Sequence, residues 1–184
     1  LRHHKSIIDL KQKIDSLPKD KVHDIDLTYI TSRGKWYHYS WKGNISKSGG
    51  VVTNIGIHFF DMLGWIFGNM KSNTLHLLTA DKASGLLQLE NANIRWYLSI
   101  DKNDLPIEAA SNDLSTYRSI SVDGDDFEFS GGFTDLHTES YKSILEGNGF
   151  GLDDARNSIE IAHLIRNQAI TTSKSDAHPL LSNE

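Results

Sequence analysis

The stretch from Ser48 to Gly68, SGGVVTNIGIHFFDMLGWIFG, constrains the fold more than any other part of this 184-residue chain. Its apolar residues recur three or four positions apart, as on one face of an α-helix. The resulting apolar stripe consists of Ile55, Phe59, Met62, Leu63 and Ile66. Ser48 is a favourable N-cap residue, and Gly68 follows the last apolar turn. The stretch therefore predicts one amphipathic helix that buries one face in the core.

Three polar side chains form a second line along this predicted helix. Asn54, His58 and Asp61 stand at positions i, i+4 and i+7, beside the apolar stripe. A neutral imidazole can accept a proton from a hydroxyl group near neutral pH, and an amide four residues earlier can bind the same substrate atom. The spacing alone favours a structural role for all three residues, as a core-edge histidine, a capping amide and a solvated carboxylate.

Two other kinds of site are not supported by the sequence. His58 and Asp61 have the spacing to share a metal ion, but no third ligand is identifiable, so we expect no metal site. The glycines between Gly147 and Gly151 are similar to those of a phosphate-binding loop. They follow a predicted helix, however, and lack the preceding strand and the lysine of such loops. We expect a helix end and a turn there, and no cofactor-binding residues in this chain.

The remaining patterns predict an α+β domain with a largely antiparallel, open-faced sheet and helices packed on one face. Helical spacing predicts helices over residues 1–17, 48–68 and 133–145, and a last helix that begins with Asp153 as its N-cap. Alternating apolar residues predict a strand over 22–31, a three-stranded meander within 72–100, and a hairpin of 117–122 with 126–129. Residues 34–48 and 101–116 are expected to be loops, and 171–184 a polar tail.

Composition excludes several classes of protein. Nineteen Lys and Arg against twenty-four Asp and Glu give a net charge of −5, which argues against binding to nucleic acid or to an anionic membrane. The chain has no cysteine, so disulfides, thiolate metal centres and a cysteine nucleophile are excluded, which fits the cytoplasm. The longest apolar run is interrupted by polar side chains, so we expect no membrane span. Leu1 in place of methionine indicates a piece of a longer polypeptide.

The run SWKGNISKSGGVVTNIGIHFFDMLGWIFG, preceded by RGKWYHY and followed by GFGLDDARNSIEIAHLIRN, resembles the C-terminal domain of Gfo/Idh/MocA-type oxidoreductases. The resemblance covers nearly the whole chain and is strongest to the branch that oxidises the 3-hydroxyl of UDP-N-acetylglucosaminuronate in lipopolysaccharide biosynthesis. It implies that residues 1–184 are a substrate-binding and oligomerisation domain. It also implies that an N-terminal Rossmann domain, absent from this chain, binds most of the NAD cofactor.

The resemblance implies a role for each polar residue of the central helix. His58 would take the proton of the 3-hydroxyl as hydride leaves the same carbon for NAD. Asn54 would orient that hydroxyl, and Asp61 would steady the helix or the imidazole. Many relatives carry an aspartate at the position of Asn54, and the catalytic lysine of the family's Glu-Lys-Pro motif is absent here. Because an amide cannot act as a base, His58 and the absent lysine remain the candidate proton-transfer pair.

The UDP and uronate groups of such a substrate are negatively charged, so nearby cations and rings are candidate binding groups. They are Lys42, Lys47, Arg33 and Arg156, with Tyr39 and Trp41 shaping the pocket. Arg156 falls in the first turns of a predicted helix, where the dipole does not favour a cation, which favours an anionic partner. Each cation can instead be a solvated surface charge, and Trp41 an anchor in the core.

Partners and function remain open in several respects. Apolar positions alternating along the meander would leave an apolar sheet surface that a second copy could bury, which predicts a homo-oligomer. The parent protein is expected to be an NAD-dependent dehydrogenase and this fragment alone to be inactive. The alternatives are another sugar or cyclitol dehydrogenase of the same family and a non-catalytic binding or assembly module.

Overall fold

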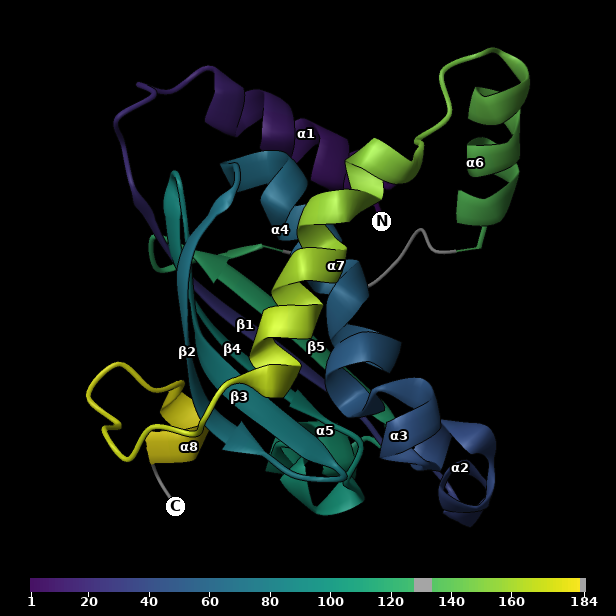
Figure 1. The fold of residues 1–184 in the computed structure, drawn as a ribbon, viewed down its shortest axis with the longest axis vertical. Helices are drawn as coiled ribbons and strands as arrows, with labels where there is room; N and C mark the ends of the chain where they lie inside the picture. The colour runs from purple at the N-terminus through teal and green to yellow at the C-terminus, as the bar shows by residue number, and fades with distance from the viewer. Residues whose placement is uncertain (128–133, 183–184) are drawn as a thin grey trace.

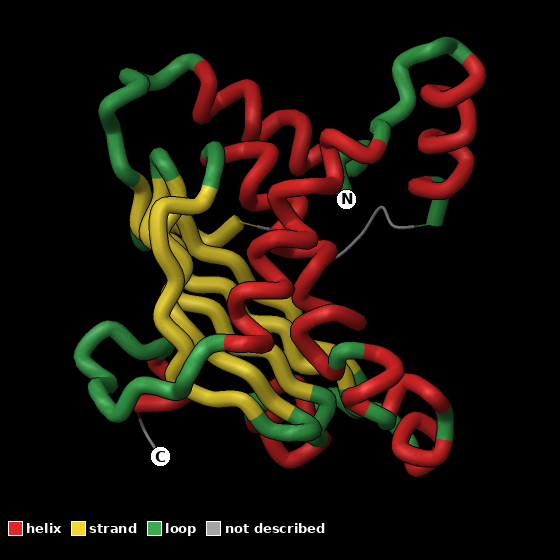
Figure 2. Tube along the Cα trace, viewed as in Figure 1, coloured by secondary structure: helices red, strands yellow, loops and turns green. Residues whose placement is uncertain are grey.

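The computed structural model describes residues 1–127 and 134–182. Figures 1 and 2 show a single sheet with helices along one face and at its ends. The strands are β1 (His23–Thr31), β2 (Met70–Leu78), β3 (Lys82–Leu89), β4 (Ala92–Ser99), β5 (Thr116–Val122) and β6 (Asp125–Phe127). The longer helices are α1 (Lys5–Asp15), α4 (Ile57–Phe67), α6 (Leu136–Leu145) and α7 (Leu152–Asn167).

The sheet has the strand order β2-β3-β4-β1-β5-β6. Every pairing is antiparallel except that between β1 and β4, which is parallel. Helices α1, α4 and α7 lie on one face (Figure 1). The expected α+β class, with a largely antiparallel sheet and helices on one face, is confirmed.

The central helix consists of two parts. A π-helical segment, η2 (Val52–Gly56), leads without a break into α4. The expected stripe of Ile55, Phe59, Met62, Leu63 and Ile66 is buried throughout, whereas Asn54 and Asp61 are half-buried and His58 is exposed. The amphipathic pattern is thus confirmed, and the polar row lies at the edge of the buried face.

The start of this helix differs in detail from the prediction. Ser48 does not open the central helix but ends a short helix, α3 (Ile45–Ser48). Its Oγ still accepts a hydrogen bond of 3.0 Å from the Gly50 N–H. Gly49 connects the two helices with φ of 77°, and a Cβ on it would lie 2.3 Å from Thr53 Oγ1. Only glycine fits this junction.

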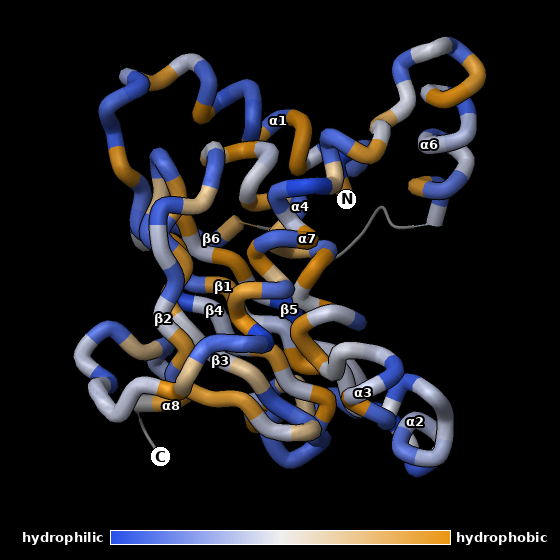
Figure 3. The backbone as a smooth tube through the Cα atoms, in the orientation of Figure 1, coloured by the Kyte–Doolittle hydropathy of each residue, from blue (hydrophilic) through white to orange (hydrophobic). Residues whose placement is uncertain are grey.

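The core lies between α4 and the middle of the sheet. The fully buried Trp96 of β4 stands beside Leu27 of β1 and Gly85 of β3 in the strand register. Its indole meets the Phe60 ring of α4 edge-on, with 5.5 Å between ring centroids. A Cβ on Gly85 would lie 2.9 Å from the indole, so glycine leaves the space that the tryptophan fills. The alternation of apolar and polar residues along the strands is visible in Figure 3.

Residues 34–48 are not the irregular loop that the sequence suggested. They form α2 (Lys35–Tyr39), the 3-10 turn η1 (Trp41–Gly43) and α3. Ser40 Oγ accepts from the Lys42 N–H at 3.2 Å, and Asn44 Oδ1 accepts from the Lys47 N–H at 3.2 Å. These two caps hold each short turn in place. The predicted loop 101–116 likewise contains the 3-10 turn η3 (Lys102–Asp104) and α5 (Ile107–Ser111).

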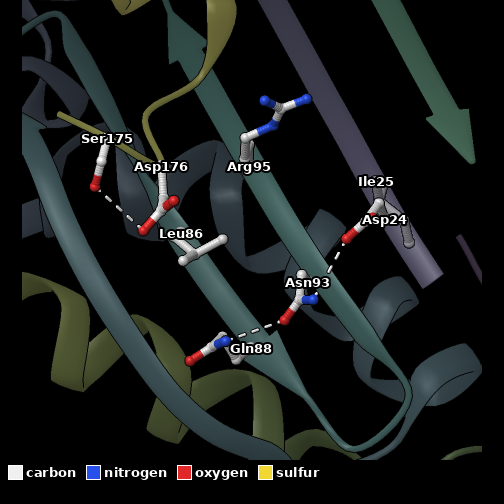
Figure 4. A pocket seen from close by; sticks show the side chains of 8 residues that line it. All are labelled: Asp24, Ile25, Leu86, Gln88, Asn93, Arg95, Ser175 and Asp176. Atoms are coloured by element: carbon white, nitrogen blue, oxygen red, sulfur yellow. Dashed lines mark hydrogen bonds between the residues drawn. The ribbon is translucent and has the colours of Figure 1, made fainter. Parts of the chain in front are cut away.

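The face of the sheet turned away from α4 is polar at one end rather than apolar as expected (Figure 4). Arg95 makes two hydrogen bonds of 2.6 Å with Asp26, and Asn93 bridges Gln88 and Asp24. Most apolar residues of β3 and β4, such as Leu87, Ile94 and Trp96, lie instead in the core beneath the helices, whereas Leu86 lies on the polar face. The meander therefore leaves no continuous apolar surface here.

The C-terminal segment is not a free polar tail. Ile170 forms a parallel bridge with Leu75, and the segment then returns to the sheet through α8 (Pro179–Ser182). Ala177, His178 and Leu181 are buried, and Leu180 packs near a small cluster formed by Ile30, Tyr97 and Leu105. The few apolar residues of this segment are enough to dock it on the far face of the sheet.

Three predicted boundaries need comment. The last helix begins at Leu152 with Gly151 as its N-cap, because the Asp154 carboxylate accepts a 2.7 Å hydrogen bond from the Gly151 N–H. Asp153 is therefore in the first turn and is not the cap. The hairpin of β5 and β6 is confirmed, but residues 128–129 of its predicted second strand lie outside the described residues, as does the predicted start of α6 before residue 134.

The helical run from Ile45 to Phe67 is long and apolar enough, by composition, to cross a membrane. Its most apolar 18-residue window is 61% buried inside the protein, and it packs against the sheet and α7. We interpret it as the core helix of the domain.

Acid is expected to weaken the docking of the C-terminal segment through His178. Its Nε2 lies 3.1 Å from Thr28 Oγ1, and burial lowers its pKa from 6.5 to about 4, while the nearby Asp26 raises it and Arg95 lowers it more weakly. The neutral imidazole therefore stabilises the fold fully above about pH 6.5, and this contribution, at most about 3 kcal/mol, is lost as the pH falls toward 4.

The measurement is urea denaturation between pH 7.5 and 4.5. The free energy of unfolding should fall less steeply with acid in His178→Asn than in the wild type. His137→Asn, which changes an exposed histidine of α6, serves as the control and should follow the wild type. Equal slopes for the wild type and His178→Asn would contradict the assignment.

Candidate active site

Two residues of the polar row, Asn54 and His58, line a pocket of about 260 Å³. The walls come from η2 and α4, from β1 and from β5, together with the first residue of the chain. The lining residues are Leu1, Tyr29, Arg33, Asn54, Ile55, His58, Phe59 and Arg118. The structure thus brings together His58, Asn54 and Arg33, three of the residues expected at the site.

Asn54 is held by the segment that precedes the central helix. Its Nδ2 donates to Tyr37 Oη at 3.3 Å and to the Lys42 carbonyl at 3.4 Å. It lies in the π-helical turn η2, and such turns often mark functional positions because the wider turn shifts the side chains of a helix relative to one another. The side-chain oxygen of Asn54 is left to meet a donor in the pocket, such as a substrate hydroxyl.

His58 is suited to accept a proton. Burial lowers its pKa from 6.5, and this effect outweighs the charge of Asp61, which raises it. The residue nevertheless keeps an exposed surface toward the pocket. The imidazole is therefore mainly neutral at pH 7 and accessible to a ligand.

Asp61 forms an ion pair with Arg2 and does not line the pocket. Its carboxylate accepts two hydrogen bonds from Arg2, of 3.0 Å to Nε and 2.7 Å to Nη2. Arg2 is buried, and its Nη2 also donates to the Asp154 carbonyl at 2.7 Å. Asp61 thus ties α4 to the N-terminal segment and to α7, and it acts on His58 only through its charge.

Two residues that lie at the pocket or support it, Arg118 and Tyr37, were missed in the sequence. Arg118 of β5 stands opposite Tyr29 of β1, and its guanidinium carbon lies 5.2 Å from the centre of the Tyr29 ring. A signal was present, because Arg118 lies on the same face of β5 as Ile120 and Val122, which contribute to the core. A charged residue on the core-facing side of a strand indicates a specific partner or a site.

Tyr37 was also missed, although it lies in the aromatic segment that the sequence singled out. It is buried, and its hydroxyl accepts the hydrogen bond from Asn54. Burial raises its pKa above 10, while the Asn54 bond and Arg33 act in the opposite direction. Tyr37 is therefore a neutral phenol that fixes the orientation of Asn54.

Five expected binding residues do not line the pocket. Tyr39 and Trp41 are largely exposed, at 89% and 58%, and the Lys42 amine lies 6.0 Å from the Trp41 ring centre. Lys47 is exposed on α3, and Arg156 pairs with Asp153 at 3.3 Å in the same helix. The Lys42 carbonyl accepts a hydrogen bond from the lining residue Asn54. A role for the others requires a ligand that extends beyond the pocket.

The described residues do not form a cradle for a dinucleotide. The glycines from Gly147 to Gly151 join α6 to α7, so the strand that precedes such a cradle is missing. Within residues 1–127 and 134–182, no group of three or more His, Asp or Glu side chains is placed to hold a metal ion. Among its described residues, the pocket offers a neutral base, an amide and two guanidinium groups.

Comparison with known proteins gives one family and a set of similar structures. Residues 20–161 match the family described as "Oxidoreductase family, C-terminal alpha/beta domain". The chain is 47% identical to the WlbA (WbpB) dehydrogenase from Thermus thermophilus in complex with NAD and alpha-ketoglutarate, with a TM-score of 0.92. It is 46% identical to that dehydrogenase in complex with NAD and UDP-GlcNAcA, with a TM-score of 0.91.

This chain is shorter than the proteins that it matches. Both matches include 97% of this chain, but the chain spans only 58% and 57% of the Thermus chains. The WlbA dehydrogenase from Bordetella pertussis, in complex with NADH and UDP-GlcNAcA, has a TM-score of 0.67 at 14% identity. This match covers 89% of this chain and 59% of that one, and at such identity it supports the fold alone.

Removing the carboxylate of Asp61 should destabilise the protein. Asp61→Asn breaks the paired hydrogen bonds to the buried Arg2, and we expect a loss of about 2 kcal/mol because Asp61 is partly exposed. Asp9→Asn removes an exposed partner of Lys5 and is expected to change stability by less than about 0.5 kcal/mol. Chemical denaturation of both variants checks this, and similar losses in the two would exclude a special role for the Arg2 pair.

Proposed function

The chain belongs to the oxidoreductase family represented by the Gfo/Idh/MocA C-terminal alpha/beta domain, and we propose that its parent is an NAD-dependent dehydrogenase acting on a UDP-sugar acid. The substrate would be UDP-N-acetylglucosaminuronate, oxidised at its 3-hydroxyl. The chain would supply the sugar pocket, and a Rossmann domain elsewhere in the parent would hold most of the cofactor. The relatives at 46–47% identity are NAD complexes, which supports the same cofactor here.

One observation carries the proposal. A histidine whose pKa is lowered and an oriented amide share a pocket with two arginines, and the pocket belongs to a chain 46% identical to a structure with UDP-GlcNAcA. A hydroxyl to be oxidised needs a proton acceptor, and an acidic sugar needs cations. The pocket offers both within one small volume.

The residues of this chain divide the work as follows. NAD, when bound, accepts the two electrons that leave the sugar carbon as hydride. His58 removes the hydroxyl proton through a neutral ring nitrogen. The Asn54 amide is fixed by Tyr37 and the Lys42 carbonyl, which accept both of its Nδ2 hydrogens. Its oxygen accepts a hydrogen bond from the hydroxyl of the incoming sugar and so orients this hydroxyl until its proton passes to His58. Asp61 holds α4 in place through Arg2.

We also propose that the parent enzyme regenerates NAD with a 2-oxo acid. The Thermus relative has been solved with NAD and alpha-ketoglutarate, and the pocket here contains two guanidinium groups suited to a carboxylate. A protonated His58 left by sugar oxidation would return its proton when the oxo group becomes a hydroxyl. Both reactions would then use one base.

Further parts of the proposal concern the setting of the enzyme. We place it in the cytoplasm, in lipopolysaccharide biosynthesis, with the fragment alone inactive. We expect self-association through the far face of the sheet, as a polar contact around Arg95 and Asp26 rather than an apolar one. We expect neither nucleic acid nor a membrane as partner.

Replacement of His58 tests the proposal. In the full-length parent, His58→Ala should lower kcat with UDP-N-acetylglucosaminuronate by roughly 100-fold or more, because general-base catalysis contributes that much. In the wild type, kcat/KM should fall as the pH drops through the His58 pKa, which lies below 6.5, because the protonated ring cannot act as a base. NADH absorbance measures both.

Controls separate the alternatives. His163→Ala removes an exposed histidine of α7 and should leave kcat unchanged. A panel of neutral sugars, cyclitols and UDP-sugar acids identifies another dehydrogenase of the family if a neutral substrate is preferred. Binding of a UDP-sugar without any NADH formation would instead support a binding module.

A further inference from the structure

Helix α6 exposes an apolar face. Tyr141, Ile144 and Leu145 stand at positions i, i+3 and i+4 and are 69%, 53% and 87% exposed. The charged residues Glu139 and Lys142 lie on the other side of the helix and pair with each other at 2.7 Å. The helix is therefore amphipathic, but its apolar side is turned toward solvent in this domain.

This helix is too short to be stable by itself. It has ten residues, Leu136–Leu145, and none of them is buried. Isolated helices shorter than about 12–15 residues are marginal in water, and helices in proteins owe most of their stability to the packing of an apolar face. Figure 1 shows α6 standing apart from the sheet and from the helices that cover it. A stable α6 therefore needs a packing surface that the described residues do not supply.

The N-terminal segment lies beside α6. Leu1 and Arg2 line one pocket of about 250 Å³ together with Ser140 of α6 and Phe150 of the loop that follows it. The Arg2 guanidinium carbon lies 4.7 Å from the centre of the Phe150 ring. Arg2 is in turn held by its paired hydrogen bonds to Asp61. A domain joined to this one at Leu1 would therefore begin next to α6.

Leu1 also lines the His58 pocket. In the proposed parent, the cofactor domain would be joined at Leu1, because the matching family is described as a C-terminal domain. It would also have to bring NAD into contact with the sugar carbon beside His58, since hydride transfer needs close approach. Leu1 borders both pockets, so both conditions place the cofactor domain on the side of the molecule from which α6 projects.

We infer that the apolar face of α6 docks on the cofactor domain of the same polypeptide and helps to hold that domain over the His58 pocket. The inference rests on the proposed function and extends it by naming the surface through which the two domains bind each other. A covalently joined domain has an effective concentration on the order of millimolar, so it occupies this face in preference to a second copy.

The contacts behind α6 connect this face to the central helix. Phe150 packs on Arg2 and lies 6.4 Å from Trp65 of α4, measured between ring centroids. Arg2 binds Asp61, which is also on α4. The loop that follows α6 is thus fixed to the helix that carries His58. A domain docked on α6 would take its position relative to His58 partly from these contacts.

Photo-crosslinking identifies the surface that α6 meets. In the NAD-loaded full-length parent, Tyr141→p-benzoylphenylalanine places a photoreactive ketone on the apolar face. Irradiation should form a link within one polypeptide, which mass spectrometry should map to the cofactor domain. Glu139→p-benzoylphenylalanine, on the opposite side of α6, should give no such link. The inference is overturned by a link between two copies, by a link within this domain, by the absence of a link from Tyr141, or by equal links from both positions.

Hydrogen exchange of α6 in the same full-length enzyme measures the strength of the docking. Leu145→Ser should make the α6 amides exchange roughly 10-fold faster, because a buried leucine contributes about that factor to the contact. Glu139→Ser lowers the helix propensity by a similar amount on the opposite side and should have a much smaller effect. Unchanged exchange of the sheet amides shows that the domain stays folded. Equal acceleration by the two substitutions contradicts docking through the apolar face.

Neither measurement depends on turnover, which keeps this inference separate from the proposed function. If no UDP-sugar acid is oxidised but position 141 links to the cofactor domain, the proposed substrate is wrong and the docking surface stands. If the sugar acid is oxidised and position 141 links elsewhere, only the docking surface is wrong. A parent without a nucleotide-binding domain overturns both.

Discussion

The contact between the central helix and the sheet is the constraint on which the site depends. Phe60 and Trp96 meet edge-on in the middle of the core, and the apolar stripe of α4 is buried around them. Burial of this stripe fixes the rotation of the helix about its axis and therefore also fixes the side on which its polar row lies. The row is therefore presented at the edge of the buried face, where Tyr29 and Arg118 from two strands complete a pocket.

The polar row itself is divided among three tasks by its surroundings. Asn54 is oriented by Tyr37, His58 is kept neutral by partial burial, and Asp61 is neutralised by Arg2. The pairing of Asp61 with Arg2 helps to keep His58 neutral, because an unpaired carboxylate one turn away would favour the protonated imidazole more strongly. The ion pair that holds α4 in place thus also limits the charge acting on the candidate base.

The sequence was sufficient for features that repeat along the chain. The helical stripe through Phe59 and Ile66, the meander and the class of the fold all follow from periodicity, because burial selects residues at regular spacing. The polar row and the resemblance it supported identified His58, Asn54 and Arg33. His58 and Asn54 belong to one short helical pattern, and Arg33 directly precedes the aromatic segment that the sequence singled out.

Contacts between residues far apart in the chain could not be predicted from such periodic patterns. Arg118 enters the site only because β5 pairs with β1, and Asp61 meets Arg2 only because α4 packs near the N-terminal segment. The docking of the C-terminal segment depends on Leu75 and Thr28, far away in the chain. The short helices of residues 35–48 were missed for another reason, because their caps Ser40 and Asn44 close turns too short to show periodicity.

The parallel pairing of β1 with β4 has a consequence for how the domain assembles. Arg95 and its partner Asp26 are 69 positions apart in sequence, so the centre of the sheet forms only when a long intervening segment has closed into a loop. That segment contains the whole central helix, and its buried face has no complete surface to pack on before closure. Such non-local contacts slow folding. The pocket of His58 therefore depends on a non-local step of the folding reaction, although Asn54, Ile55, His58 and Phe59 lie close together in the chain.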